Sequence, residues 1–199
     1  MKAFGYMKKW FLNNLAAIVL IIAFIPIFIL TQFNDRIIER IGTTSIEYLD
    51  NEYYRWITCI FYHYDYGHIF FNSVALICVG SLLTPFIGNL KTIILFLLGG
   101  ALAEIPFSLL VHYGEAIYGG GSSGGIFALT AALLVCWLRF PGAFRFKRYR
   151  PDLLIVLAYF VLANDNQSSF LTHSFGFIAG ILFATGMVIF GFIRYEPKA

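Results

Sequence analysis

The chain has 199 residues, of which 59% are hydrophobic and 13% are charged, and its formal net charge is +3. Soluble domains usually carry about a quarter of charged residues, so this composition excludes an ordinary soluble domain and favours one lipid-embedded domain spanning residues 1–199. We therefore expect the lipid bilayer as its surroundings and no nucleic-acid partner. The cysteines Cys59, Cys78 and Cys136 are too widely spaced for a metal or redox motif, so neither metal nor cofactor is expected.

Apolar runs of helical length follow one another along the chain. They lie at about 11–33, 69–87, 92–111, 124–138, 153–163 and 171–193. The first has no small-residue cleavage pattern, so it is expected to be a retained span rather than a signal peptide. The runs do not alternate as barrel strands would, and the fourth and fifth are short for spans. The pattern predicts an all-α membrane protein, a six-transmembrane-helix bundle.

Lysine and arginine residues are distributed unevenly between the two sides of this predicted bundle. With the N-terminus inside, eleven fall on the inner side and only Arg36, Arg40 and Arg55 on the outer side. Because cytoplasmic loops carry an excess of basic residues, both ends, 1–10 and 194–199, are expected to be cytoplasmic. The expected location is a prokaryotic plasma (inner) membrane, crossed several times. The basic run at 139–150 is explained by topology alone, although it could also bind anionic lipid.

The longest connection lies at about 34–67 and is expected to be external. It contains most of the acidic residues, together with apolar side chains such as Ile37, Trp56 and Phe61. We expect interfacial helices here rather than open coil.

A glycine-rich segment at 118–125 fits several motifs. It matches a dinucleotide fingerprint and a hydrolase nucleophile elbow, but both motifs need a preceding strand that a membrane bundle does not supply. A flexible external loop is the remaining alternative. Ser123, however, precedes Arg139 by 16 residues, about 24 Å of helix in a hydrocarbon core of roughly 30 Å. Irregular backbone at that depth requires burial or a water-filled cavity, which a membrane hydrolase would need.

The sixth run contains a histidine and a small-residue pattern that match the fourth run. Gly176 and Gly180 follow His173 on one helical face, and the fourth run carries Gly124 and Ala128. Small residues four apart let two membrane helices approach closely. This contact would bring Ser123 and His173 together as a nucleophile and its general base.

Polar residues also occur near the outer end of the second run. His68 and Asn72 lie four apart on one face, and buried polar residues in spans are usually functional. Their expected role is to donate hydrogen bonds to an oxyanion, together with the backbone N–H of Ser123 at a helix N-terminus. No carboxylate clearly completes a triad. Asp165 could orient His173 or be a solvated loop residue, and Glu104 could pair with a hydroxyl or line a cavity.

Four segments together carry a family resemblance. They are Tyr54-Arg55 with Thr58 and His63, His68-Ile-Phe-Phe-Asn72, Gly121-Ser-Ser-Gly124 and His173-Ser-Phe-Gly-Phe-Ile-Ala-Gly180. In this order, over about two thirds of the chain, they closely resemble the rhomboid family of intramembrane serine proteases. The resemblance implies a six-helix fold and the hydrolysis of peptide bonds in or near transmembrane segments of protein substrates.

The resemblance also implies residue roles. Ser123 is the implied nucleophile and His173 the implied base, while His68, Asn72 and Gly120 are the implied oxyanion residues. Phe127 is expected to pack on the histidine. The chain departs from the family at Tyr54, where tryptophan is usual, at Thr84, where many members have glutamate, and at Phe170 and Thr172, where smaller or amide residues are common.

Two other functions are compatible with the pattern. One is a proteolytically inactive rhomboid-like protein that binds membrane clients, and the other is a small transporter that uses the polar cavity. The absence of inverted repeats counts against the transporter.

Overall fold

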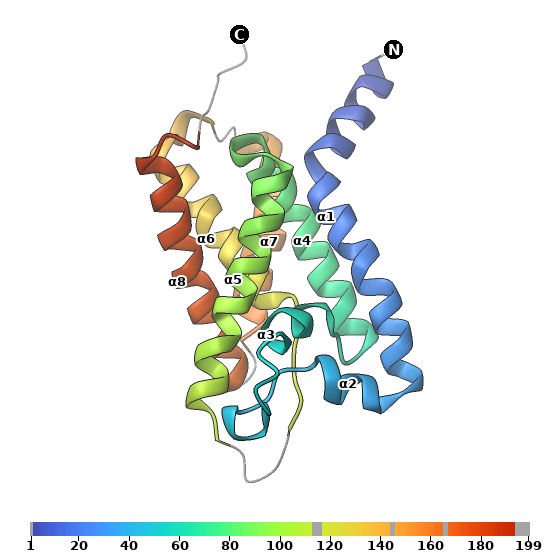
Figure 1. Cartoon of the computed structure of the whole chain (residues 1–199). Helices are drawn as coiled ribbons and strands as arrows, with labels where there is room; N and C mark the ends of the chain where they lie inside the picture. The colour runs from blue at the N-terminus through green and yellow to red at the C-terminus, as the bar shows by residue number, and fades with distance from the viewer. Residues whose placement is uncertain (1, 113–116, 144–145, 165–166, 194–199) are drawn as a thin grey trace.

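The computed structural model describes residues 2–112, 117–143, 146–164 and 167–193, and the regular structure in these ranges is helical. The long helices are α1 (Lys2–Phe33), α4 (Tyr66–Ile87), α5 (Asn89–Leu110), α6 (Ser123–Arg139), α7 (Phe146–Leu162) and α8 (Gln167–Ile189). They form the bundle in Figure 1, and each overlaps one of the expected apolar runs, although α1 and α7 begin nine and seven residues before theirs. The prediction of an all-α fold is therefore confirmed for the described part of the chain.

The long helices differ in their capacity to cross a membrane. Within the described ranges, α1, α4, α5 and α8 contain four stretches that are long and apolar enough to span a bilayer. The apolar helices Ser123–Arg139 and Pro151–Leu162 are shorter. The structure thus supports a helical membrane protein, and the six-span count stays a prediction.

Helix α6 lies at the centre of the bundle, where it packs against α4, α5 and α8. Most of its side chains between Gly124 and Leu133 are buried. Several neighbours fit only because they are glycines: a β-carbon on Gly176 would collide with the carbonyl oxygen of Gly124, and one on Gly180 with that of Ala128. These contacts confirm the close approach of α6 and α8 that the small-residue spacing predicts.

Two polar side chains connect α1 to its neighbours. Thr84 of α4 donates a hydrogen bond to the carbonyl oxygen of Asn13. Asn89 at the start of α5 donates to the carbonyl oxygen of Leu12 and accepts from the N–H of Ala16, at 2.9 Å each. Thr84, where the resemblance implies glutamate, therefore serves as a contact between α1 and α4.

The connection between α1 and α4 contains four short helical segments. They are α2 (Asp35–Ile41), η1 (Ile46–Tyr48), α3 (Arg55–Thr58) and η2 (Cys59–Phe61). In Figure 1, α2 and α3 lie at one end of the bundle, while the start of α1 and the end of α8 lie at the other. The expectation of helices in this segment is confirmed, whereas their contact with a membrane interface stays a prediction.

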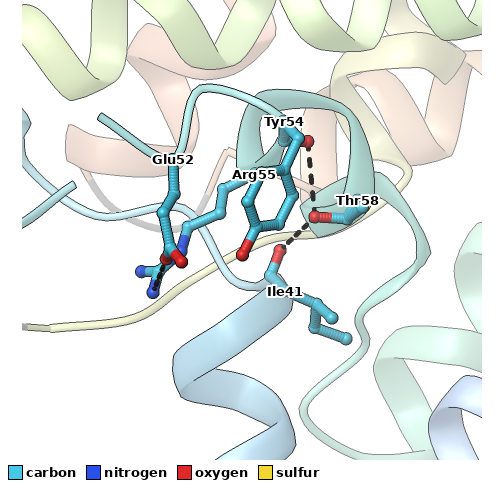
Figure 2. Close-up of polar contacts among 5 residues, drawn as sticks. All are labelled: Ile41, Glu52, Tyr54, Arg55 and Thr58. Atoms are coloured by element: carbon cyan, nitrogen blue, oxygen red, sulfur yellow. Dashed lines mark hydrogen bonds and ion pairs between the residues drawn. The ribbon is translucent and has the colours of Figure 1, made fainter. Parts of the chain in front are cut away.

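Polar contacts fix the turn that contains α3, as Figure 2 shows. The hydroxyl of Thr58 donates to the carbonyl oxygen of Ile41 at 2.9 Å and lies 3.4 Å from that of Tyr54. The guanidinium of the buried Arg55 pairs with Glu52 at 2.6 Å. The side chain of Tyr54 is 50% exposed, so tyrosine in place of the usual tryptophan disturbs little packing.

Candidate active site

A cavity of about 970 Å³ opens between α4, α5, α7, α8 and the glycine-rich segment. Its lining includes four of the predicted site residues, namely His68, Asn72, Gly120 and Ser123. The fifth, His173, is 5% exposed and follows Thr172, which lines the cavity. Four of the five residues that the sequence singled out thus line one cavity, and the fifth is next to a residue that lines it.

The glycine-rich segment approaches its neighbours too closely for side chains. Gly120 and Gly121 have φ values of 159° and 153°. A β-carbon on Gly120 would collide with the carbonyl oxygen of Cys59, and one on Gly121 would lie 2.8 Å from Cε1 of His68 and 3.8 Å from Oγ of Ser123. The N–H of Gly121 donates to the same Cys59 oxygen at 3.0 Å. Glycine is required here because it lets the backbone pass between His68 and Cys59.

Ser123 is the first residue of α6, and no side chain among the described residues caps this helix end. The first N–H groups of a helix have no partner inside the helix, and the helix dipole favours negative charge at this end. The first turn of α6 therefore combines a hydroxyl with backbone N–H groups that can bind an anion, and the predicted oxyanion role stays a prediction.

His173 stacks on Phe127, with ring centroids 4.2 Å apart and an interplanar angle of 7°. Phe127 follows Ser123 by one helical turn, so the two residues share a face of α6. The stack places the imidazole against the face of α6 that carries the serine. No hydrogen bond joins the Ser123 hydroxyl to another described residue, which is compatible with catalytic bonds that tighten only when substrate binds.

Asn164, just after α7, holds the other side of the imidazole. Its Oδ1 lies 2.8 Å from Nδ1 of His173, and its Nδ2 donates to the carbonyl oxygen of Phe160 at 2.8 Å. The second bond fixes which amide atom faces the histidine, so Nδ1 must carry the proton. In the neutral ring Nε2 then lacks a proton and can accept one from a serine.

Sequence reasoning missed Asn164. The neighbouring candidate for this role, Asp165, lies outside the described residues. An amide nine residues before the histidine, at the end of an apolar run, was the available signal.

The amide of Asn72 is held by α7. Its Oδ1 accepts a hydrogen bond from the hydroxyl of Tyr159. Its Nδ2 is buried and has no hydrogen-bond partner among the described residues. A buried donor without a partner is costly, and a ligand oxygen in the cavity would satisfy it. Tyr159, which sequence reasoning also missed, thus orients the donor that was predicted for the oxyanion.

The two adjacent serines have different surroundings. Ser122 is fully buried, and its Oγ lies 3.0 Å from Nε2 of His63. The Nδ1 of His63 lies 3.3 Å from the carbonyl oxygen of Phe61, which can only accept, so Nε2 accepts from Ser122. Burial and the neighbouring His68 lower the pKa of His63 to about 3, so this ring is neutral. Ser122 is therefore a packing residue, whereas Ser123 lines the cavity.

A family sequence model described as the Rhomboid domain matches residues 50–190. The chain belongs to the rhomboid family. One relative, RHOMBOID-like protein 5 of Arabidopsis thaliana, is 29% identical over 85 residues, which make up 43% of this chain and 27% of that protein. The match thus spans about a quarter of the length of that relative.

The rhomboid pattern and the structure agree on the placement of Phe127 against His173. The departure at Phe170 is a side chain that is 58% exposed. An exposed phenylalanine thus stands three residues before the histidine, where the resemblance implies a smaller or amide residue, while Asn164, just after α7, contacts the imidazole.

Proposed function

We propose that this rhomboid is an intramembrane serine protease that hydrolyses peptide bonds in or near the transmembrane segments of its substrates. The observation that carries the proposal is the His173 ring, which is stacked on Phe127 and bonded at Nδ1 by Asn164 beside the helix that begins with Ser123. This arrangement supplies the tautomer and the orientation that a general base needs.

The proposed reaction follows the chemistry of serine hydrolases. Nε2 of His173 takes the hydroxyl proton of Ser123 as Oγ attacks the scissile carbonyl. The resulting oxyanion receives hydrogen bonds from Nδ2 of Asn72, from the backbone N–H of Ser123 and from the His68 ring. The imidazolium then protonates the leaving amine as the C–N bond breaks, and water hydrolyses the acyl-enzyme with His173 again as base.

The proposed topology has six spans with both ends of the chain in the cytoplasm, so the cavity opens towards the extracytoplasmic side. A helical substrate hides its carbonyl groups, so segments with small or helix-destabilising residues near the scissile bond are the expected substrates. The family match and the apolar helices support an integral membrane protein in which this arrangement is possible.

Cleavage of a model transmembrane substrate by the purified protein tests the proposal. The Ser123→Ala and His173→Ala variants should each abolish cleavage while the protein stays folded in detergent. Ser122→Ala should retain cleavage, because the hydroxyl of Ser122 is bonded to His63 and does not line the cavity. A wild-type protein that binds such substrates without cutting them would indicate a client-binding rhomboid instead.

A further inference from the structure

Glu104 of α5 has no evident structural role. Its side chain lines the same cavity as Ser123 although the residue is only 4% exposed. No hydrogen bond or ion pair joins its carboxyl group to another described residue. The sequence allowed two roles for Glu104, pairing with a hydroxyl or lining a cavity. The structure shows that it lines the cavity.

A second polar group without a partner lies at the same cavity. Thr43 is 1% exposed, lines the cavity, and its Oγ1 makes no hydrogen bond to the described chain. Its backbone is fixed by a β-bridge to Gly119, with hydrogen bonds of 2.9 and 2.8 Å. Thr43 is therefore held next to the segment that leads into Ser123.

Glu104 also lies near the same segment. The preceding residue, Ala103, touches the first turn of α6 so closely that a β-carbon on Gly124 would lie 2.7 Å from its own. Glu104 also lies close enough to Cys59 to raise the pKa of that thiol electrostatically, and Cys59 accepts the N–H of Gly121. Glu104 and Thr43 thus both flank the segment 119–123.

Burying a carboxyl group without a hydrogen bond is expensive, and most such groups in folded proteins have a partner. Arg55, the buried cation of the external segment, pairs with Glu52 and lies over the ring of Tyr118, and no ion pair joins it to Glu104. A hydroxyl that enters this part of the cavity could donate a hydrogen bond to the carboxyl group of Glu104 and accept one from Oγ1 of Thr43, and an ammonium group could donate to both.

We propose that Glu104 and Thr43 form a subsite for a hydrogen-bond-donating side chain, a hydroxyl or a cation, at one of the two residues that flank the scissile bond. This subsite rests on the proposed protease function. A carboxyl group keeps an accepting oxygen whether or not it is protonated. The preference for a substrate hydroxyl therefore does not depend on the charge state of Glu104. An apolar side chain would leave both groups without a partner, which is how polar sites discriminate against apolar analogues.

The test compares kcat/KM for substrates that differ in one residue at each flanking position. Serine is paired with alanine, and lysine with methionine of similar length. At one of the two flanking positions, kcat/KM of the wild-type protein should be about tenfold or more higher for serine than for alanine, and for lysine than for methionine. Glu104→Leu should reduce both preferences to near one. Glu104→Gln should keep the serine preference, because an amide oxygen still accepts, and reduce that for lysine.

Controls separate this subsite from other roles of Glu104. Glu39→Gln removes an exposed carboxylate on α2 and should leave both preferences unchanged. If Glu104→Leu does not fold, Thr43→Val, which keeps the shape of the side chain, should lower the serine preference. If Glu104→Leu lowers kcat/KM by the same factor for every substrate, the proposal is overturned. A carboxyl group that only positions the hydrolytic water would give this result, because it does not distinguish substrate side chains.

Equal cleavage of both members of each pair by the wild-type protein would also overturn the subsite, while leaving the proposed protease intact. If the folded wild-type protein cleaves none of the substrates, the protease proposal fails, and the subsite fails with it.

Discussion

Oδ1 of Asn164 lies 2.8 Å from Nδ1 of His173, so an amide just after α7 orients the imidazole on α8. This amide is itself fixed by its bond to Phe160. The contact gives His173 an orienting partner that the sequence did not identify.

Asn164→Leu should therefore lower kcat by about ten- to a hundredfold with a much smaller change in KM, because it affects the base rather than substrate binding. Asn164→Asp keeps an accepting oxygen and should recover part of the loss, although its carboxylate repels the Phe160 carbonyl. Steady-state kinetics on both purified variants check this. Equal losses in the two variants would indicate a purely structural role for Asn164.

Asn72→Ala should lower kcat by about ten- to a thousandfold without a comparable loss of substrate binding, because its Nδ2 would donate to charge that develops only in the transition state. Tyr159→Phe removes the bond that orients this amide and should cost less, about three- to tenfold. Combining the two changes should add little to Asn72→Ala alone. An unchanged kcat with a raised KM in Asn72→Ala would assign the amide to substrate binding instead.

Gly176→Ala should destabilise the protein by about 1–3 kcal/mol, because its β-carbon would push α8 away from Gly124. It should also lower cleavage, since the same displacement separates His173 from Ser123. Gly186→Ala on the same helix is the matched control: nothing lies within 4 Å of its β-carbon, so stability should be kept or slightly raised. Thermal unfolding in detergent measures both. Equal stability of the two variants would contradict the close packing of α6 and α8.

His63 should make the fold less stable in mild acid, because only the unfolded chain binds a proton there. Its pKa is lowered from 6.5 to about 3 in the folded protein, mainly by burial and also by His68. Below about pH 6.5 the unfolded chain therefore takes up a proton that the folded one does not, so stability falls by up to about 1.4 kcal/mol per pH unit. Unfolding midpoints between about pH 7.5 and 5 should show this fall, and His63→Gln should reduce it. The same slope in the variant would assign the pH dependence to other groups.

The apolar runs and small-residue spacing predicted the parts of the site that depend on helical periodicity. His68 and Asn72 share a face because they lie four apart, and the contact of α6 with α8 follows from Gly176 and Gly180. Periodicity determines which residues share a face, and glycine spacing indicates where two helices approach.

The contacts that orient the site could not be read in this way. Tyr159 meets Asn72 across 87 residues of sequence, and His63 meets Ser122 across 59. Such pairs depend on how far each helix slides along its neighbour and on how the external segment turns back to the glycine-rich segment. An apolar pattern fixes neither, so Tyr159 and Asn164 emerge only from the structure.

The most direct test of the account is the reaction of the purified protein with a fluorophosphonate probe, followed by mapping of the modified residue. We predict that Ser123 is modified in the wild-type protein and in Ser122→Ala, and that modification is lost in Ser123→Ala and strongly reduced in His173→Ala. Modification that persists in Ser123→Ala, or a folded wild-type protein that does not react, would contradict the assignment of Ser123 as a nucleophile activated by His173.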